Sequence, residues 1–186
     1  HIVNTLQNSL IAKSHKKTDK LDAKTLCSQL CKDILPEPIY KPPHAQRELR
    51  QLVSQRNQYV KSRSRAINRT RCFLKSHGIM ERKKDMRSPG YRLELSAKLS
   101  HMSNSFKRRL TAYFETIEFF SGHIKNLETE MYGHLKQHFF TEYCRLITLP
   151  GVALITASSI ISVVGDWSRF KSGRKLCSYL GIAPSV

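Results

Sequence analysis

The sequence predicts a mainly α-helical fold whose centre is a long antiparallel hairpin of two helices. Residues 44–77 and residues 91–140 each carry two columns of apolar side chains at seven-residue spacing. That spacing keeps the apolar side chains on one stripe of a helix, and steps of three and four residues are typical of a coiled-coil seam. Because a loop joins the two helices, we expect them to fold back on each other. The columns comprise Leu52, Tyr59, Ala66, Phe73, Val53, Val60, Ile67 and Leu74 in the first helix, and Phe106, Tyr113, Phe120, Leu127, Leu110, Ile117, Ile124 and Met131 in the second.

The segment before the hairpin is predicted to combine a strand end, a helix and a linker. Residues 1–14 mix β-branched and polar side chains, which favours the end of a strand followed by a loop. Residues 16–32 have a helical pattern, with Thr18 as a suitable N-cap. Four prolines within residues 36–43 make this stretch a stiff linker that separates the first segment from the hairpin.

The charge of the chain is strongly positive and unevenly placed. Its 32 Lys and Arg residues outnumber 14 Asp and Glu residues, which gives a net charge of +18 at pH 7. Residues 44–92 hold fourteen of the basic residues and three of the acidic ones, whereas residues 93–142 are balanced. A basic helix of this kind is typical of nucleic-acid binding, because cations on one face repel one another unless a polyanion screens them. The alternative is a face that is merely solvated.

Membrane binding and secretion are less consistent with the sequence. The longest nearly apolar run, residues 152–165, is too short to span a bilayer and is interrupted by threonine and serine.

The five cysteines are an odd number without a C-x-x-C pair, which favours free thiols; Cys27 and Cys31 are expected to be half-buried. With no signal peptide, we expect a cytoplasmic protein of prokaryotic type, associated with the nucleoid. Because the chain begins with His and ends without a polar tail, we also expect an internal piece of a longer protein.

The stretch from Leu149 to Ala153 has the shape of a helix-hairpin-helix turn. Gly151 allows the backbone to approach a phosphate, and the free N–H groups of the helix predicted over residues 153–164 can bind it. Ala153 stands where such turns usually have a second glycine. The alternative is a tight turn before a buried helix.

Two sets of side chains invite a metal-site interpretation. Asp19 and Asp22 stand at i and i+3, so both carboxylates lie on one face of the first helix. Carboxylates suit Mg²⁺, and phosphoryl-transfer chemistry uses such ions to activate the attacking and leaving oxygens. Acids in a first helical turn also complement the helix dipole, and spacing alone favours that interpretation. Glu130, His134 and His138 stand at i, i+4 and i+8, but a solvated helix surface is the better interpretation.

Three segments, in this order, resemble one known family. Residues 17–23, Lys-Thr-Asp-Lys-Leu-Asp-Ala, resemble the K-T-D-x-x-D-A segment that ends the RuvC-like domain of DEDD transposases. The helical hairpin follows. The remaining residues resemble the opening of that family's C-terminal transposase domain through Leu149-Pro150-Gly151-Val152, Gly165-Asp166, Arg169-Phe170, Ser172, Leu176, Tyr179-Leu180-Gly181 and Pro184-Ser185. The family is the insertion-sequence one-hundred-and-ten group of bridge-RNA-guided recombinases.

The resemblance implies a domain order and a metal site. The order would be the end of an α/β RuvC-like domain, a Pro-rich linker, the coiled-coil hairpin and the start of a helical C-terminal transposase domain. Asp19 and Asp22 would be the last two acids of the DEDD tetrad, coordinating Mg²⁺, with the first two acids upstream of His1. The family's catalytic serine would lie just beyond Ser185, which is not itself assigned that role. This chain alone is therefore expected to be inactive. The expected boundaries are residues 1–35, 36–43, 44–142 and 143–186.

The implied function is that of a DNA transposase or recombinase of an insertion sequence, binding DNA and a guide RNA and forming a homo-oligomer. Basic side chains of the hairpin and the C-terminal segment, together with one glycine, are expected to contact nucleic acid. They are Arg47, Arg50, Arg56, Arg63, Arg65, Arg69, Arg71, Lys75, Gly151, Arg169, Lys171 and Arg174. The alternative from another class is a non-enzymatic nucleic-acid-binding protein, a basic coiled coil with a helix-hairpin-helix end.

Overall fold

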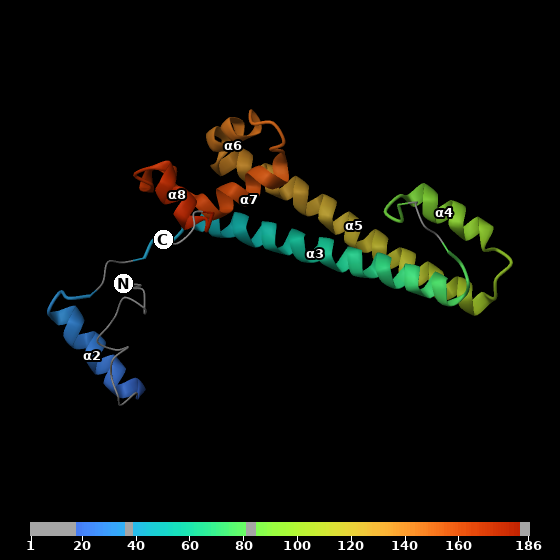
Figure 1. Cartoon of the computed structure of the whole chain (residues 1–186), viewed down its shortest axis with the longest axis horizontal. Coiled ribbons are helices and arrows are strands. Elements are labelled where there is room, and N and C mark those ends of the chain that lie inside the picture. Colours follow the sequence, from blue (N-terminus) through green and yellow to red (C-terminus); the bar gives the residue numbers. More distant parts are fainter. Residues whose placement is uncertain (1–17, 36–38, 81–84, 183–186) are drawn as a thin grey trace. The chain divides into compact units, whose positions relative to one another are not determined.

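A computed structural model describes residues 18–35, 39–80 and 85–182, which form helices and turns and contain no β-strand. This confirms a mainly α-helical chain; the strand end predicted within residues 1–14 lies outside the described residues. None of the helices in the described residues is long and apolar enough to cross a membrane. The helices, shown in Figure 1, are α2 (Asp19–Cys31), α3 (His44–Ser76), α4 (Pro89–Lys98), α5 (Asn104–His138), α6 (Phe140–Ile147), α7 (Leu154–Val164), the 3₁₀ helix η2 (Trp167–Arg169) and α8 (Gly173–Tyr179).

The chain divides into two compact units, residues 1–42 and residues 43–186. In the first unit, α2 begins where the sequence predicts: the hydroxyl oxygen of Thr18 accepts a hydrogen bond of 3.4 Å from the N–H of Leu21, as an N-cap does. All five cysteines of the chain are free, as predicted. Cys27 and Cys31 are exposed, however, so the prediction of half-buried thiols is wrong: no described residue covers their side of α2.

The second unit is organised around α3 and α5, which lie side by side and run antiparallel, as predicted (Figure 1). Phe73 near the end of α3 stacks on Phe106 near the start of α5, with ring centroids 4.9 Å apart. At the opposite end, the Ala45 carbonyl oxygen lies 2.8 Å from Nε2 of His134. All sixteen residues of the predicted apolar columns are buried or half-buried. The seven-residue pattern therefore identified the contact faces of both helices.

One hydrophobic core closes the end of the hairpin at which the chain passes from α3 to α5. It joins α3, α4, α5 and the turn before α4, and its completely covered side chains include Leu74, Leu95 and Ile117. Arg92 of α4 is buried within this end, donates hydrogen bonds to the Met86 carbonyl oxygen, and forms an ion pair with a carboxylate of α5. Helix α4 thus covers the closed end of the hairpin.

The Ser-Pro-Gly stretch at residues 88–90 does not form the turn before α4, because that turn falls earlier. Met86 and Arg87 make it, and Pro89 is already the first residue of α4. Proline suits that position because its fixed φ is helical and its missing N–H would have no helical partner there. A non-helical break at residues 99–103 separates α4 from α5: the Ser103 hydroxyl accepts a hydrogen bond of 3.2 Å from the N–H of Phe106 and caps α5.

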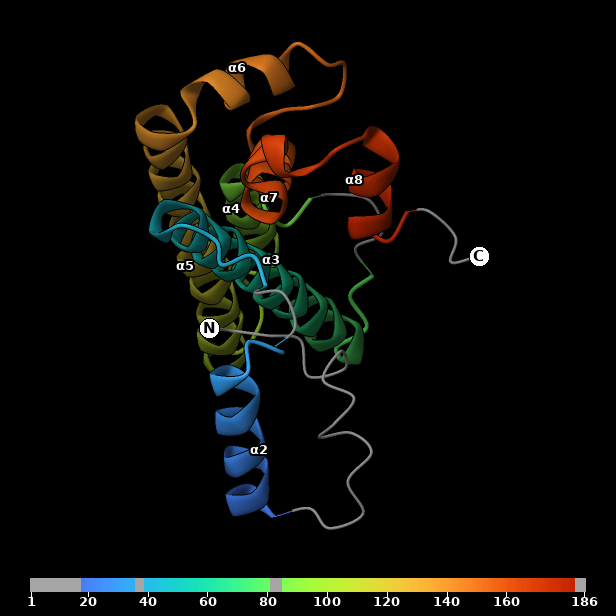
Figure 2. The same cartoon turned by 90° about the vertical axis from the view of Figure 1, so that its left-hand side faces the viewer.

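A second hydrophobic core lies at the open end of the hairpin. Leu49 of α3, Leu135 of α5 and Ile161 of α7 are completely buried against one another. The sequence predicted a single helix to about residue 140, but the chain breaks at Phe139 and restarts as α6. Figure 2 shows α6 and α7 next to the ends of α3 and α5. The C-terminal helices therefore belong to the same compact unit as the hairpin.

Side chains of α3 hold the C-terminal end of α7. Gln46 is completely buried and donates from Nε2 to the carbonyl oxygens of Ser162 (3.1 Å) and Val163 (3.4 Å). Arg50 donates to the same Ser162 oxygen from Nε (3.2 Å) and Nη2 (2.9 Å). Carbonyl groups at a helix end have no partner within the helix, so these donors replace water. Gly165 ends α7 with a φ of 64°, and a Cβ added there would collide with the amide of Gln46.

Replacing Gly165 with Ala should destabilise the protein more than the same change at Gly78. Both glycines have positive φ, 64° and 77°, so each Ala carries backbone strain of about 1–2 kcal/mol. Only at Gly165 does the new Cβ also displace Gln46 from its hydrogen bonds, which adds about 1–3 kcal/mol; nothing lies within 4 Å of the Cβ position at Gly78. The free energy of unfolding in urea measures the difference. Equal losses in the two variants would show that Gln46 can move without cost.

Candidate functional site

Asp19 and Asp22 occupy the first turn of α2, as the sequence placed them. Asp19 is exposed and Asp22 is half-buried, and neither side chain forms an ion pair within the described residues. Two carboxylates three residues apart can give oxygen ligands to a hard cation. The described residues contain no group of three or more His, Cys, Asp or Glu side chains that could hold a metal ion. The pair therefore supplies at most part of a metal site, and it also complements the dipole of α2.

His134 of α5 contributes to the fold. His134 is half-buried, and its Nε2 lies 2.8 Å from the Ala45 carbonyl oxygen, so it donates a hydrogen bond to the start of α3. Its ring lies 4.7 Å from that of His138. With Glu130 exposed, this trio forms no metal-binding group among the described residues.

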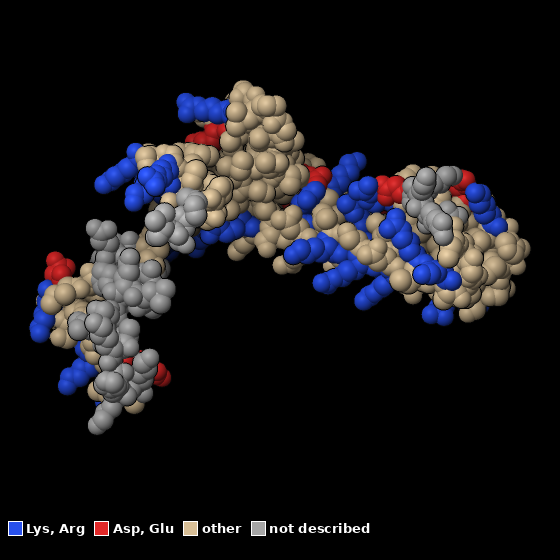
Figure 3. Space-filling model, in the orientation of Figure 1, with Lys and Arg blue, Asp and Glu red and all other residues tan. Residues whose placement is uncertain are grey.

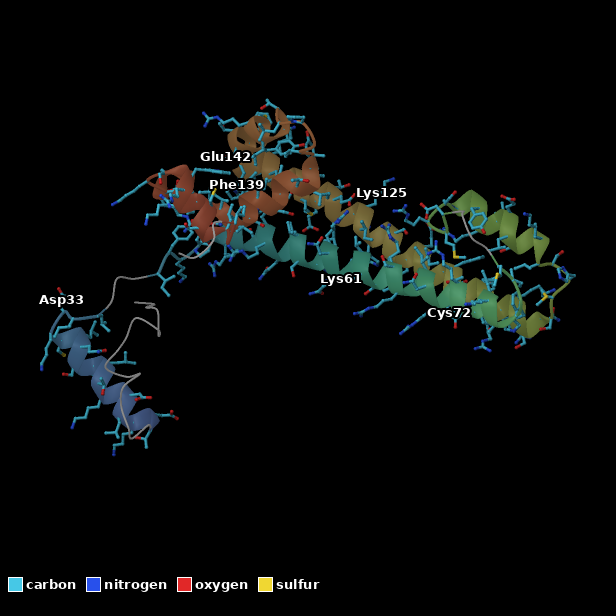
Figure 4. The ribbon with its side chains drawn as sticks, viewed as in Figure 1. Asp33, Lys61, Cys72, Lys125, Phe139 and Glu142 are labelled. Atoms are coloured by element: carbon cyan, nitrogen blue, oxygen red, sulfur yellow. The ribbon has the colours of Figure 1, made fainter. Side chains whose placement is uncertain are left out.

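Most of the basic residues predicted to bind nucleic acid lie on the outer surface of α3. Figure 3 shows Lys and Arg side chains projecting along the helix pair, and Figure 4 places Lys61 on α3 and Lys125 on α5. Five of the predicted residues are exposed, and their side chains form no hydrogen bond or ion pair within the described part of the chain. The free cations of α3 are these five, Arg47, Arg65, Arg69, Arg71 and Lys75, together with Lys61, which is also exposed and without a partner in the described residues.

Of the other three predicted arginines of α3, Arg50 and Arg56 are hydrogen-bonded within the protein and Arg63 is half-buried. Arg50 holds the end of α7, as described above. Arg56 donates to Oε1 of Glu128 on α5 from Nε (3.0 Å) and Nη2 (2.8 Å), which makes a half-buried ion pair across the hairpin. Arg63 is half-buried, and burial followed by the nearby charges of Arg87 and Arg56 lowers the pKa of its guanidinium. Sequence alone shows the charge of such residues but not their partners.

The turn between α6 and α7 is short and exposed around Gly151, whose φ is 82°. The N–H of Val152 donates to the Leu149 carbonyl oxygen at 3.1 Å, and α7 begins two residues later. Ala153 provides no side-chain cap, so no hydroxyl or carboxylate occupies the first-turn N–H groups of α7. A helix, a glycine turn and a second helix with an uncapped start are arranged as a helix-hairpin-helix phosphate site requires. Contact of Gly151 with a phosphate stays a prediction.

The three basic residues near the C-terminal end differ in their surroundings. The guanidinium of Arg169 lies over the rings of Phe170 and Tyr179, at 4.2 Å and 4.3 Å from their centroids. It also donates to the Val164 carbonyl oxygen at 3.1 Å from Nη2, which adds another donor at the end of α7. Lys171 and Arg174 are exposed. Arg169 therefore supports the fold, while the other two remain accessible.

Sequence reasoning did not single out Gln46 or Arg87. Nothing in the local sequence marks Gln46, because its partners lie more than a hundred residues away. Arg87 belongs to the basic run that follows the first long helix, and that run was the available signal. In the structure, Arg63, Arg71 and Arg87 line the same pocket.

Two family models match this chain, one over its N-terminal part and one over its C-terminal part. A DEDD transposase model of the IS110 group matches residues 1–79, which include Asp19, Asp22 and helix α3. A model described as the transposase IS116/IS110/IS902 family matches residues 143–186, which include α7 and α8. The chain belongs to the IS110 family of transposases.

Curated relatives of this IS110-family chain are transposases from several bacteria. The transposase for insertion sequence element IS1111A of Coxiella burnetii is 28% identical over 141 residues, 75% of this chain and 38% of that protein. A probable family 20 transposase of Pseudomonas aeruginosa is 24% identical, and the transposase for insertion sequence element IS1328 of Yersinia enterocolitica is 26% identical; each match covers 90% of this chain and 49% of the relative. The chain thus spans less than half the length of these relatives. No solved structure matches it.

Replacing Arg50 with Met should lower stability, whereas replacing Arg47 with Met should not. Arg50 donates two hydrogen bonds to the end of α7, and loss of a charged donor to a buried carbonyl costs about 1–3 kcal/mol. The Arg47 side chain is exposed and has no partner in the described residues, so its loss stays within about 0.5 kcal/mol. Thermal unfolding of both variants checks this. A stable Arg50 variant would mean that Gln46 alone satisfies the end of α7.

Proposed function

We propose that the full-length protein is a DNA transposase or recombinase of an insertion sequence, and that this chain contributes a nucleic-acid-binding hairpin and part of a Mg²⁺-dependent DEDD site. One observation carries the binding role: the apolar face of α3 is buried against α5, while its six free cations face solvent without partners in the described residues. Membership of a transposase family supports the enzymatic role.

The free cations suit the backbone of a nucleic acid. Each cation that meets a phosphate releases condensed counterions, so binding gains free energy without any reading of sequence. DNA is the partner that transposition requires, and we propose a guide RNA as the second partner because the family resemblance implies one. A protein that acts on chromosomal DNA would work at the nucleoid. In this view sequence selection comes from the nucleic acids, and α3 supplies affinity.

The exposed apolar side chains of α5 support a homo-oligomer. Phe119 and Tyr132 are 57% and 46% exposed, although both lie on a helix whose other large apolar residues are mostly covered. Burying such rings against a second copy of the chain would remove apolar surface from water. We therefore propose that copies associate through the residual apolar surface of α5.

The proposed metal site uses Asp19 and Asp22. A divalent cation such as Mg²⁺ prefers carboxylate oxygen ligands, and both side chains are free of ion pairs within the described residues. When bound, the ion would activate oxygen atoms in a phosphoryl-transfer step. The two aspartates would hold and orient it, together with carboxylates from elsewhere in the full-length protein, because two acids alone do not complete a four-acid site.

Binding of this chain to duplex RNA or DNA should weaken steeply with salt. If five to eight cations meet phosphates, the logarithm of the association constant should fall with the logarithm of salt concentration at a slope of about −4 to −7. Fluorescence anisotropy with a labelled duplex between low and moderate salt measures the slope. A flat response would show that the basic face is only solvated.

Changing Asp19 and Asp22 together to Asn should abolish recombination by the full-length protein. Asn keeps the size and polarity of Asp but removes the negative charges that a divalent cation needs. Recombination between two plasmid-borne sites measures activity, and circular dichroism confirms that helicity is retained. As a matched control, Asp33→Asn removes an exposed acid beyond the end of α2 and should leave activity unchanged. Activity that survives the double change would rule out the metal role.

A further inference from the structure

A polar pocket of about 270 Å³ lies between α3 and the turn that precedes α4. Its lining includes Arg63, Asn68 and Arg71 of α3, which occupy one side of the helix at spacings of five and three residues. Asp85 and Arg87 line it from the turn. Three arginines from two segments of the chain therefore converge on one cavity beside the closed end of the hairpin.

The charges of the pocket are not balanced within it. Arg87 is bound to Asp85 through Nε at 2.7 Å and Nη2 at 2.6 Å, and its backbone N–H donates to the same carboxylate at 2.9 Å. Asp85 is the only acid among the described residues that line the pocket, and these bonds hold it. The side chains of Arg63 and Arg71 form no hydrogen bond or ion pair within the described residues. Two guanidinium groups therefore line the pocket with their donors unused.

Arg63 is the most confined of these cations. It is half-buried, and burial together with the charges of Arg87 and Arg56 lowers its pKa. A guanidinium nevertheless stays protonated at neutral pH. The fold thus holds a positive charge partly away from water and next to other positive charges. An anion in the pocket would offset both the partial loss of hydration and the repulsion between the positive charges.

We infer that this pocket seats a single phosphate group of the nucleic-acid backbone, an assignment that rests on the proposed function and locates one of its contacts. Guanidinium groups match phosphate oxygens with paired, charge-assisted hydrogen bonds, and the Asn68 amide adds a neutral donor. The described residues that line the pocket include no aromatic side chain, so they offer a base no ring on which to stack. The pocket is therefore suited to phosphate and not to a base. Such a contact would fix the position of the protein along the nucleic acid without reading its sequence.

Two matched variants separate a built pocket from a diffuse basic surface. Arg63→Gln removes the confined guanidinium, and Arg65→Gln removes a free cation that stands two residues away and does not line the pocket. Anisotropy titrations of this chain with a labelled duplex RNA and a duplex DNA should show a loss of about tenfold for Arg63→Gln. The loss for Arg65→Gln should be about twofold, as for one phosphate contact on an open surface. Equal losses in the two variants, with unchanged unfolding midpoints, would overturn the pocket assignment.

A third variant predicts an effect of the opposite sign. Among the described residues that line the pocket, Asp85 is the one acid; Asp85→Asn removes it and frees Arg87, so duplex affinity should rise about threefold. Asp85 is exposed, and its change does not open the core. A fall in affinity would contradict the inference, because it would mean that the Asp85–Arg87 pair is needed to build the site.

Calorimetric titration with inorganic diphosphate distinguishes a failure of this inference from a failure of the proposed function. If the unmodified chain binds diphosphate, and Arg63→Gln does not, the pocket takes phosphate. Should the same chain bind no duplex, the phosphate would come from a free anion, and the assignment to a nucleic-acid backbone would be wrong. The pocket assignment would also be refuted if the unmodified chain bound no diphosphate and the two Gln variants bound duplex equally well.

Discussion

The arrangement of the second unit depends on the carbonyl groups that end α7. Ser162 and Val164 are buried, so water cannot replace the helical partners that these groups lack, and an unmet buried carbonyl costs about 1–3 kcal/mol. Gln46 and Arg50 from α3, and Arg169 from the following turn, supply the donors. Because these side chains meet one helix end, they fix where α7 sits along α3. The apolar core of Leu49, Leu135 and Ile161 then forms around that position.

The same helix separates packing from charge. One side of α3 is apolar and buried against α5, which lies within residues 93–142, where acidic and basic residues balance. The Arg56–Glu128 pair is an ion pair that joins the two helices. The remaining cations of α3 have no acid of α5 opposite them in the described residues and stay on the outer side. Stability and polyanion attraction therefore come from different faces, and a change on the basic face need not disturb the core.

The sequence could predict those features that follow from local periodicity. The seven-residue columns gave both long helices and their contact faces, because side-chain spacing along a helix determines which residues share a side. The loop that joins the two helices gave their antiparallel order. It could not predict the break at Phe139, whose ring packs against the core of the open end, or the burial of Gln46. Those depend on residues far away in the chain. Cys27 and Cys31 were misplaced for a related reason, since spacing gives a shared face but not what covers it. For the candidate site, charge identified the helix, yet Arg56 and Arg65 look alike in sequence, and only three-dimensional neighbours distinguish a paired side chain from a free one.

The chemistry of arginine explains how one helix can serve both purposes. A guanidinium carries five N–H donors in a planar fork, whereas a lysine ammonium carries three at a single point. Arg50 uses Nε and Nη2 on the Ser162 carbonyl oxygen and still has donors on Nη1, so a contact that holds the fold does not exhaust the side chain. Arg87 is bound to Asp85 at its Nε and Nη2 edge in the same manner. Arginines that the protein already positions lose less conformational entropy when a phosphate arrives than mobile surface lysines do. The engaged arginines of α3 are therefore compatible with nucleic-acid contact, and their fixed positions favour a defined path for the backbone over a diffuse one.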